Sequence, residues 1–250
     1  MNKNYTIPAL CKTITLLEYL GKSESGGSQA ELARVLGIPN STCYRILQSL
    51  LAYNWIRQKP GSLYVVANGI LAAAGKLINE TADFECLQPV LEQLAKASGL
   101  SCKLSIRQED MQTTIMRAES SAPITVTGKV GVHFPITEGA TGAALLYDES
   151  SENILQLVAT CRENIEEKKY PNLIDERLLN LKENGYCMNS HLNRWGIEAM
   201  AAPLLDSTGH IIAAITVMGF TSDFTSKNIE IIVANLRKAI KECTNILKLR

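Results

Sequence analysis

Apolar positions three or four residues apart mark three segments near the start of the chain, a spacing that predicts short amphipathic helices. The first helix is predicted over Pro8–Lys22. The second begins at Ser28, because Ser28 and Glu31 match a capping box, and it ends near Gly37. The third begins at Asn40, a second cap candidate. Their predicted buried positions are Leu10, Ile14, Leu17 and Leu20, then Leu32, Val35 and Leu36, then Cys43, Ile46, Leu47, Leu50 and Leu51.

A hairpin is predicted after the third helix. Trp55–Gln58 and Leu63–Val66 are short strand-like runs on either side of Lys59-Pro60-Gly61-Ser62, a sequence typical of a turn. The second and third helices, joined by a tight turn, are typical of a helix-turn-helix, and the hairpin adds a wing. We therefore predict a winged helix-turn-helix domain over residues 1–68 and a linker helix over residues 69–82.

The remaining residues, 83–250, alternate between strand-like and helix-like patterns. Strands are predicted in two hairpins, Cys102–Arg107 with Gln112–Arg117 and Ile197–Leu205 with Ile211–Met218. Helices are predicted over residues 84–98, 140–147, 173–183 and 223–248. This mixture, with strands paired in hairpins, predicts an α+β domain around an antiparallel sheet.

The formal net charge of zero conceals opposite charges in the two parts of the chain. The first 76 residues hold eight basic and three acidic residues, a net charge of +5, so the remainder carries −5. A basic module beside an acidic body favours contact between the N-terminal part and a polyanion such as DNA.

Several functional classes are disfavoured by the residue types present. Seven dispersed cysteines without a C-x-x-C pair are typical of reduced thiols. No apolar run reaches the roughly 18 residues of a membrane span, and the first ten residues lack a signal-peptide core. We therefore expect a cytoplasmic protein without membrane contact.

Catalysis and cofactors are not expected either. The three histidines, His133, His191 and His210, lack metal-ligand spacing, and no G-x-S-x-G nucleophile motif occurs. The alternative is a transition metal held by His and Cys residues that only the fold brings together.

Three signatures in the chain resemble those of the IclR family of bacterial transcriptional regulators. Gln29–Leu50 is similar to that family's helix-turn-helix, Pro135–Leu145 to a segment of its sensor domain, and Gly185–Gly209 to its second sensor signature. The resemblance extends from about Pro8 to Lys248 and implies a C-terminal effector-binding domain of GAF or PAS type. Thr137 stands where the family usually has a histidine, which bears on the effector rather than on the fold.

Two sites follow from the helix faces and the resemblance together. The first residues of a recognition helix reach base edges in the major groove, and cations in a wing contact phosphates. The predicted DNA-binding residues are Asn40, Ser41, Thr42, Tyr44, Arg45 and Gln48 in the third helix, and Arg57 and Lys59 in the wing. The effector pocket that the resemblance implies is lined by His133, Gly139, Ala140, Asn189, Ile197, Ala199, Thr216 and Met218.

The pocket residues predict a ligand with a polar end and an apolar end. We expect the Gly139 and Ala140 amides to bind a carboxylate or hydroxyl, while Ala199 and Met218 contact an apolar part. An aromatic or medium-chain acid fits, and a sugar-derived acid is the alternative. Ordinary packing of these residues in a sheet, without a ligand, is the competing interpretation.

The resulting hypothesis is a ligand-responsive transcriptional regulator that binds a double-stranded, pseudo-palindromic operator and controls catabolic genes. A homodimer or tetramer is expected, with the first helix and the linker forming the dimer contact, as the resemblance implies. Two alternatives are a small-molecule sensor whose winged helix docks to protein, and an enzyme built on the C-terminal fold. The polar and cationic face of the third helix disfavours the first, and the missing nucleophile and metal motifs disfavour the second.

Overall fold

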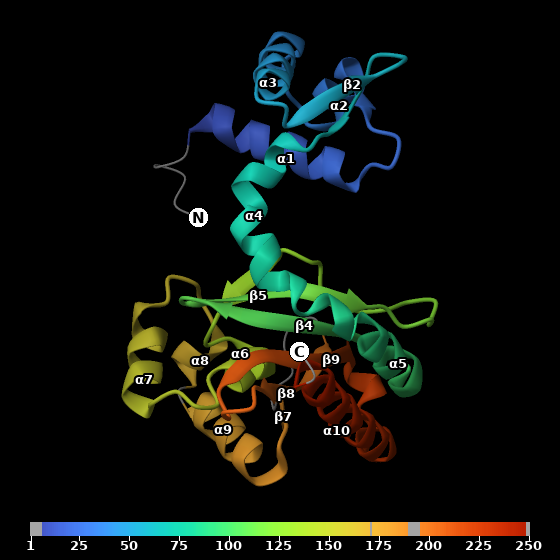
Figure 1. The fold of residues 1–250 in the computed structure, drawn as a ribbon. Helices are drawn as coiled ribbons and strands as arrows, with labels where there is room; N and C mark the ends of the chain where they lie inside the picture. The colour runs from blue at the N-terminus through green and yellow to red at the C-terminus, as the bar shows by residue number, and fades with distance from the viewer. Residues whose placement is uncertain (1–6, 171, 190–195, 249–250) are drawn as a thin grey trace. The chain divides into compact units, whose positions relative to one another are not determined.

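The structure of the protein, a computed structural model, describes residues 7–170, 172–189 and 196–248. Contacts within the chain divide it into two compact units, Met1–Glu80 and Thr81–Arg250. Helix α4 (Gly69–Ala82), at the position of the predicted linker, crosses this division (Figure 1). His191 lies outside the described residues.

The first unit is a set of short helices around a small antiparallel sheet. The helices and the hairpin predicted from the sequence are present. A third strand, β1, pairs with β3 in the sheet order β1-β3-β2 and was not predicted, because two residues are too few to show a strand pattern. The elements are α1 (Pro8–Lys22), β1 (Gly27–Ser28), α2 (Gln29–Val35), α3 (Asn40–Ala52), β2 (Ile56–Lys59) and β3 (Leu63–Val66).

The capping predictions hold in part. The Ser28 hydroxyl accepts a hydrogen bond from the Glu31 amide at 3.3 Å, as expected for the start of α2. The Glu31 carboxylate does not complete the box, because it accepts instead from the Tyr19 hydroxyl at 3.1 Å and so ties α2 to α1. The prediction that Asn40 caps α3 is wrong, since Pro39 occupies the cap position and its carbonyl accepts from the Cys43 amide.

Packing in the first unit covers the C-terminal half of α1 and leaves the other half open. Leu16 and Leu20 are buried in its core, whereas Leu10 is 55% exposed and Ile14 is 49% exposed. Val35 is likewise 48% exposed, contrary to prediction. Helical spacing identifies an apolar face, but only the neighbouring elements decide how much of that face is covered.

The second unit is built on a six-stranded antiparallel sheet of order β6-β5-β4-β9-β8-β7. Both predicted hairpins and the predicted helices are present, whereas β6, β7, α7 and α8 were not predicted. The strands are β4 (Ser101–Gln108), β5 (Met111–Ala118), β6 (His133–Pro135), β7 (Cys187–Met188), β8 (Ile197–Leu205) and β9 (Ile211–Phe220). The helices are η2 (Glu85–Leu87), α5 (Gln88–Ser98), α6 (Gly139–Leu145), α7 (Ser151–Thr160), α8 (Glu166–Lys169), α9 (Asn172–Asn184), η3 (Thr221–Asp223) and α10 (Ser226–Lys248).

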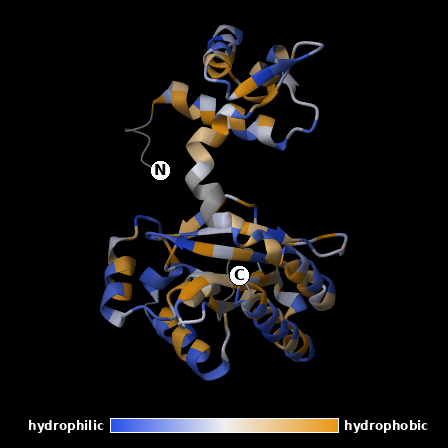
Figure 2. Cartoon of the chain, viewed as in Figure 1, coloured by the Kyte–Doolittle hydropathy of each residue, from blue (hydrophilic) through white to orange (hydrophobic). Residues whose placement is uncertain are grey.

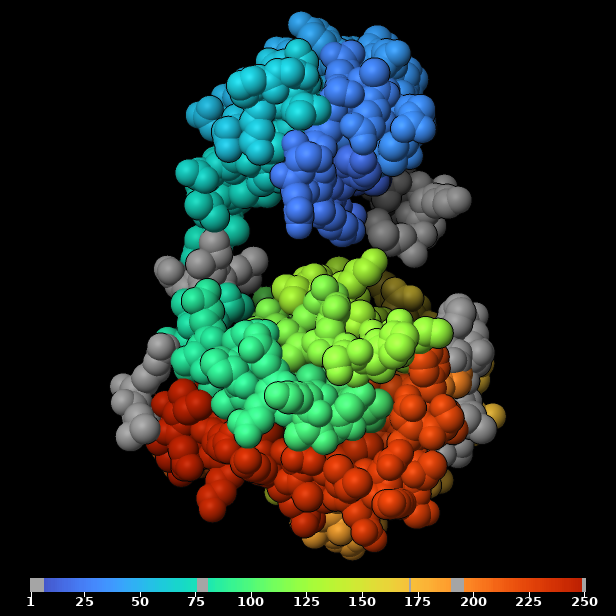
Figure 3. Space-filling model, turned by 90° about the vertical axis from the view of Figure 1, so that its right-hand side faces the viewer, coloured from blue at the N-terminus to red at the C-terminus, as the bar shows by residue number. Residues whose placement is uncertain are grey.

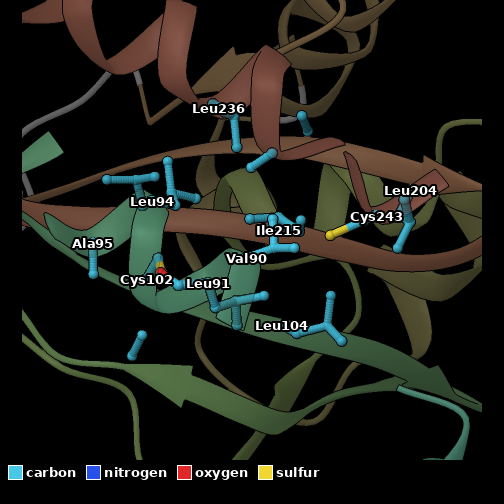
Figure 4. Close-up of a cluster of buried hydrophobic side chains, with 14 of the residues drawn as sticks. Val90, Leu91, Leu94, Ala95, Cys102, Leu104, Leu204, Ile215, Leu236 and Cys243 are labelled. Carbon is cyan, nitrogen blue, oxygen red and sulfur yellow. The ribbon is translucent and has the colours of Figure 1, made fainter. Parts of the chain in front are cut away.

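One face of this sheet forms the main hydrophobic core with α5 and α10. Cys102 and Leu104 of β4 lie in this core with Leu91 of α5 and Leu236 of α10 (Figure 4). Burial of each such leucine contributes about 1.5–3 kcal/mol to the free energy of unfolding. The polar and apolar residues of these helices lie on different sides in Figure 2, as the amphipathic pattern predicts.

The other face of the sheet carries α6 and a second core. Because successive strand residues point to opposite faces, Ser101, Lys103 and Ser105 of β4 face this side. Helix α6 approaches closely: a side chain at Gly142 would place its Cβ 2.0 Å from the carbonyl oxygen of Ile136. The predicted effector residues other than His133 gather at this polar face under a small-residue helix.

Candidate nucleic-acid interface and effector site

The buried side of α3 determines which of its residues face outward. Cys43, Ile46, Leu47 and Leu50 are buried in the core of the first unit. The side chains that remain lie on the opposite face of the helix. All of the predicted contacts on α3 belong to this face: Asn40, Ser41, Tyr44, Arg45 and Gln48 are exposed and Thr42 is half-buried.

Short polar contacts attach the start of α3 to α2. The Gln29 side-chain amide donates to the Asn40 carbonyl at 3.4 Å, and the Cys43 thiol points at the Gln29 carbonyl at 3.7 Å. Gly37, with φ +60°, forms the turn between the helices. Within the described part of the chain, the Arg45 guanidinium has no ion pair, so its charge is available to a partner outside the unit.

The wing places two cations on one hairpin. Arg57 pairs with Val65 and Lys59 with Leu63 in the β2–β3 register. The tip turns through Gly61 and Ser62, with φ +82° and +58°. Arg57 is exposed and Lys59 half-buried, which suits contact with a phosphate backbone.

The strand register brings four predicted effector residues onto one face of the sheet. Met218 lies opposite Ala199, and Phe220, two residues after Met218, lies opposite Ile197, two residues before Ala199. Thr216, two residues before Met218, therefore faces the same side. Its hydroxyl lies 2.9 Å from that of Thr141 on α6, which links the sheet to the helix above it.

The two backbone amides predicted to bind a ligand already have acceptors within the protein. The Gly139 amide donates to the Glu167 carboxylate at 2.9 Å. The Ala140 amide donates to the Asn189 side-chain oxygen at 2.7 Å. The backbone amide of Asn189 in turn donates to the Ala199 carbonyl, which holds Asn189 in place. A ligand that used these amides would have to displace both side chains.

Glu167, which accepts the first of these hydrogen bonds, belongs to a buried ion pair. The Arg177 Nη1 lies 2.5 Å from the Glu167 Oε1, and the two side chains are 3% and 2% exposed. Glu167 comes from α8 and Arg177 from α9, so the pair joins both helices to Gly139 at the start of α6. The second carboxylate oxygen and the Arg177 Nε are buried without a hydrogen-bond partner in the described residues.

The structure does not bring His133 to the other predicted effector residues. His133 is exposed on β6 opposite Thr113, whereas Phe134 lies opposite Gln112. Since Gln112 is on the face that carries α6, alternation along β6 sends Phe134 to that face and His133 to the other.

Two functional candidates on the α6 face were missed by sequence reasoning. Lys103 is 6% exposed, and burial lowers its pKa to about 8. Its ammonium lies 5.6 Å from the centre of the Phe134 ring. The other is Gln112, whose side-chain amide donates to the carbonyls of Pro135 and Glu138 at 2.9 and 2.7 Å. A lysine between Cys102 and Leu104 in a predicted strand was the available signal.

Carboxylates also gather beside α6. The pKa of Glu138 is raised by burial and by the neighbouring charges of Glu167 and Glu163. In the described ranges no group of three or more His, Cys, Asp or Glu residues could hold a metal ion. No helix in those ranges is long and apolar enough to cross a membrane.

These features define a class of protein. One unit presents a helix-turn-helix with a polar, cationic outer face, and the other is a separate α+β domain with a polar sheet face under a helix. That combination is typical of a transcriptional regulator with a sensor domain.

Family comparisons agree with this class. Residues 77–245 match the family described as "Bacterial transcriptional regulator IclR C-terminal", and residues 9–60 match the "IclR helix-turn-helix domain". The chain belongs to the IclR family of transcriptional regulators, which are not enzymes, and its second unit is the family's GAF-like effector-binding domain. The predicted family and α+β fold class are confirmed.

Individual relatives are distant in sequence. The HTH-type transcriptional repressor AllR of Escherichia coli K12 is 23% identical over 223 residues, which cover 87% of this chain and 82% of AllR. The Thermotoga maritima IclR structure has a TM-score of 0.73 at 18% identity and covers 95% of this chain and 98% of that one. An IclR homologue from Microbacterium hydrocarbonoxydans, solved with 4-hydroxybenzoate, has a TM-score of 0.68 at 14% identity, covering 97% and 100%.

Proposed function

We propose that this protein is a ligand-responsive regulator that binds a pseudo-palindromic operator as a homodimer or tetramer and controls catabolic genes. Residues 1–68 read DNA, residues 69–82 link, and residues 83–250 bind a small organic-acid or aromatic effector. The observation that carries the proposal is the outer face of α3, where Arg45 is exposed and has no ion pair among the described residues. The AllR relatives, which are named repressors, support repression as the mode of action.

An exposed apolar face at the start of α1 and its N-cap residue supports assembly into a dimer. Ile7, Leu10 and Ile14 are 65%, 55% and 49% exposed, and large apolar side chains grouped in this way mark an interaction surface. Sedimentation should therefore detect at least a dimer at micromolar concentration. A monomer that still bound a two-half-site operator tightly would contradict the dimer.

DNA recognition can be tested before the operator sequence is known. Selection from random duplexes on the full chain should yield an inverted repeat with half-sites about one helical turn apart or a multiple of it. Arg45→Ala should then weaken binding by about 1–3 kcal/mol. Arg162→Ala, an exposed arginine of the second unit, is the matched control and should bind like the parent.

Salt titration separates base reading from phosphate contact. Lys59→Ala should weaken all duplexes about equally and reduce the slope of log K against log salt by about one. If neither Arg45→Ala nor Lys59→Ala changes operator binding, the assignment of the reading head is wrong, and docking of the winged helix to protein becomes the better interpretation.

The effector is proposed to lie on the face of the sheet that carries α6, against Thr216 and Met218. The homologue solved with 4-hydroxybenzoate supports an aromatic acid as the first compound to test. Calorimetry with 4-hydroxybenzoate, pyruvate, glyoxylate and sugar acids would rank the chemical classes. Met218→Arg should abolish binding by filling the site, and unchanged binding by this variant would place the ligand elsewhere.

A further inference from the structure

Lys103 is a cation in the interior of the effector-binding domain. It lies on β4 opposite Thr216 of β9 and is 94% buried, since its relative exposure is 6%. Its neighbours Cys102 and Leu104 belong to the hydrophobic core on the opposite face. The Lys103 side chain therefore lies on the face that carries α6.

The Lys103 ammonium forms no ion pair with any of the described residues. It lies over the ring of Phe134, 5.6 Å from the ring centre. The charge of Glu138 is close enough to raise the pKa of Lys103, but the two do not form an ion pair within 4.0 Å. Burying a cation is costly unless a partner compensates it. A lysine buried in this position is therefore suited to bind an anion from outside the chain.

The surroundings of Lys103 combine one charge with apolar and hydroxyl groups. A Cβ built on Gly128 would lie 3.1 Å from Lys103 Cδ and 3.8 Å from both Met218 Cε and Thr114 Oγ1. These three side chains thus converge beneath the loop that joins β5 to β6. A small cavity adjoins Met218 and is also lined by the loop residues Ile124–Val126. It lies where the segments near residues 100, 125 and 220 meet (Figure 3).

We propose that the Lys103 ammonium binds the carboxylate of a small monoanionic effector, with Met218 contacting the effector's apolar part. This inference rests on the proposed function and replaces the Gly139 and Ala140 amides as the anchor, because those amides already donate to Glu167 and Asn189. A single lysine matches a single negative charge. A dianion would place its second charge near Glu138 without a cation to compensate it.

The first test compares acids with their neutral amides on the full-length protein. Calorimetry at pH 7 would use 4-hydroxybenzoate, hexanoate and pyruvate, each beside the corresponding amide. At least one acid should bind, and its amide should bind at least about tenfold more weakly, since a charge-assisted hydrogen bond is lost. Equal binding of acid and amide overturns the inference, as does the absence of binding by all three acids at millimolar concentration.

The second test removes the charge from the protein. Lys103→Met keeps a similar length without the ammonium and should weaken the bound acid at least about tenfold while leaving its amide unchanged. Lys96→Met, an exposed lysine on α5, is the control and should bind like the parent. Undiminished acid binding by Lys103→Met overturns the inference.

Operator binding measured on the same samples separates this inference from the proposed function. If a neutral compound releases the protein from its operator regardless of residue 103, the anchor is wrong and the regulator stands. If no duplex is selected or bound, the proposed function itself fails.

Discussion

Breaking the buried Glu167–Arg177 pair should destabilise the effector-binding domain more than most single substitutions. Both side chains are nearly fully buried and 2.5 Å apart, so Arg177→Met leaves an unpaired carboxylate in the interior. Removing one partner of such a pair costs about 3–5 kcal/mol. In a domain of this size the loss corresponds to a fall in melting temperature of about 6–20 °C.

Glu167→Gln should have a similar cost, because it leaves the Arg177 guanidinium unpaired while keeping an oxygen for the Gly139 amide. The double variant Glu167→Gln/Arg177→Met contains no unpaired charge and should recover much of the loss, so the two effects are not additive. Glu176→Gln, the same substitution at an exposed position of α9, should change stability by less than about 0.5 kcal/mol.

Urea and thermal unfolding of the full chain, followed by circular dichroism, would measure these differences. Hydrogen exchange in peptides from α6 and α9 would localise them, since the pair joins α8 and α9 to the start of α6. Single variants that cost less than about 1 kcal/mol, or a double variant as unstable as the two losses combined, would refute the reasoning.

Three further predictions concern close packing and charge. Gly69→Ala should cost about 1–3 kcal/mol in unfolding experiments, because its Cβ would lie 2.5 Å from the carbonyl oxygens of Tyr53 and Asn54; Gly75→Ala, with no atom within 4 Å, should instead stabilise α4 by about 0.5–1 kcal/mol. Gly142→Ala should destabilise α6 on the sheet, measurable as faster hydrogen exchange there, since its Cβ would overlap the Ile136 carbonyl. Lys103 has a pKa of about 8 when folded, against the usual lysine value of 10.5. Between these two pH values the unfolded chain therefore binds more protons than the folded chain, so the free energy of unfolding of the parent rises with pH. The difference in stability by which the parent falls below Lys103→Met should shrink by on the order of 3 kcal/mol as pH rises from 8 to 10.5. A pH-independent difference would contradict the buried charge.

The sequence by itself determined the elements whose signals are local. The capping contact of Ser28, the buried side of α3 and both long hairpins depend on residues close together in the chain. The sequence also shows the alternation of residues along β9, so the shared face of Thr216 and Met218 follows once the strand is predicted. Helical spacing likewise predicted the outer face of α3, which includes Arg45.

Only the tertiary structure decided which groups occupy the effector site. The Gly139 amide meets Glu167 from 28 residues away, and the fully charged four-residue helix α8 that supplies Glu167 has no apolar periodicity to reveal it. Phe134 rather than His133 lies on the face that carries α6, because β6 is a three-residue edge strand whose orientation is set by its pairing with β5. The burial of Lys103 depends on a loop that packs over it, and a lysine's environment is set by neighbours distant in the chain rather than by its position in a strand.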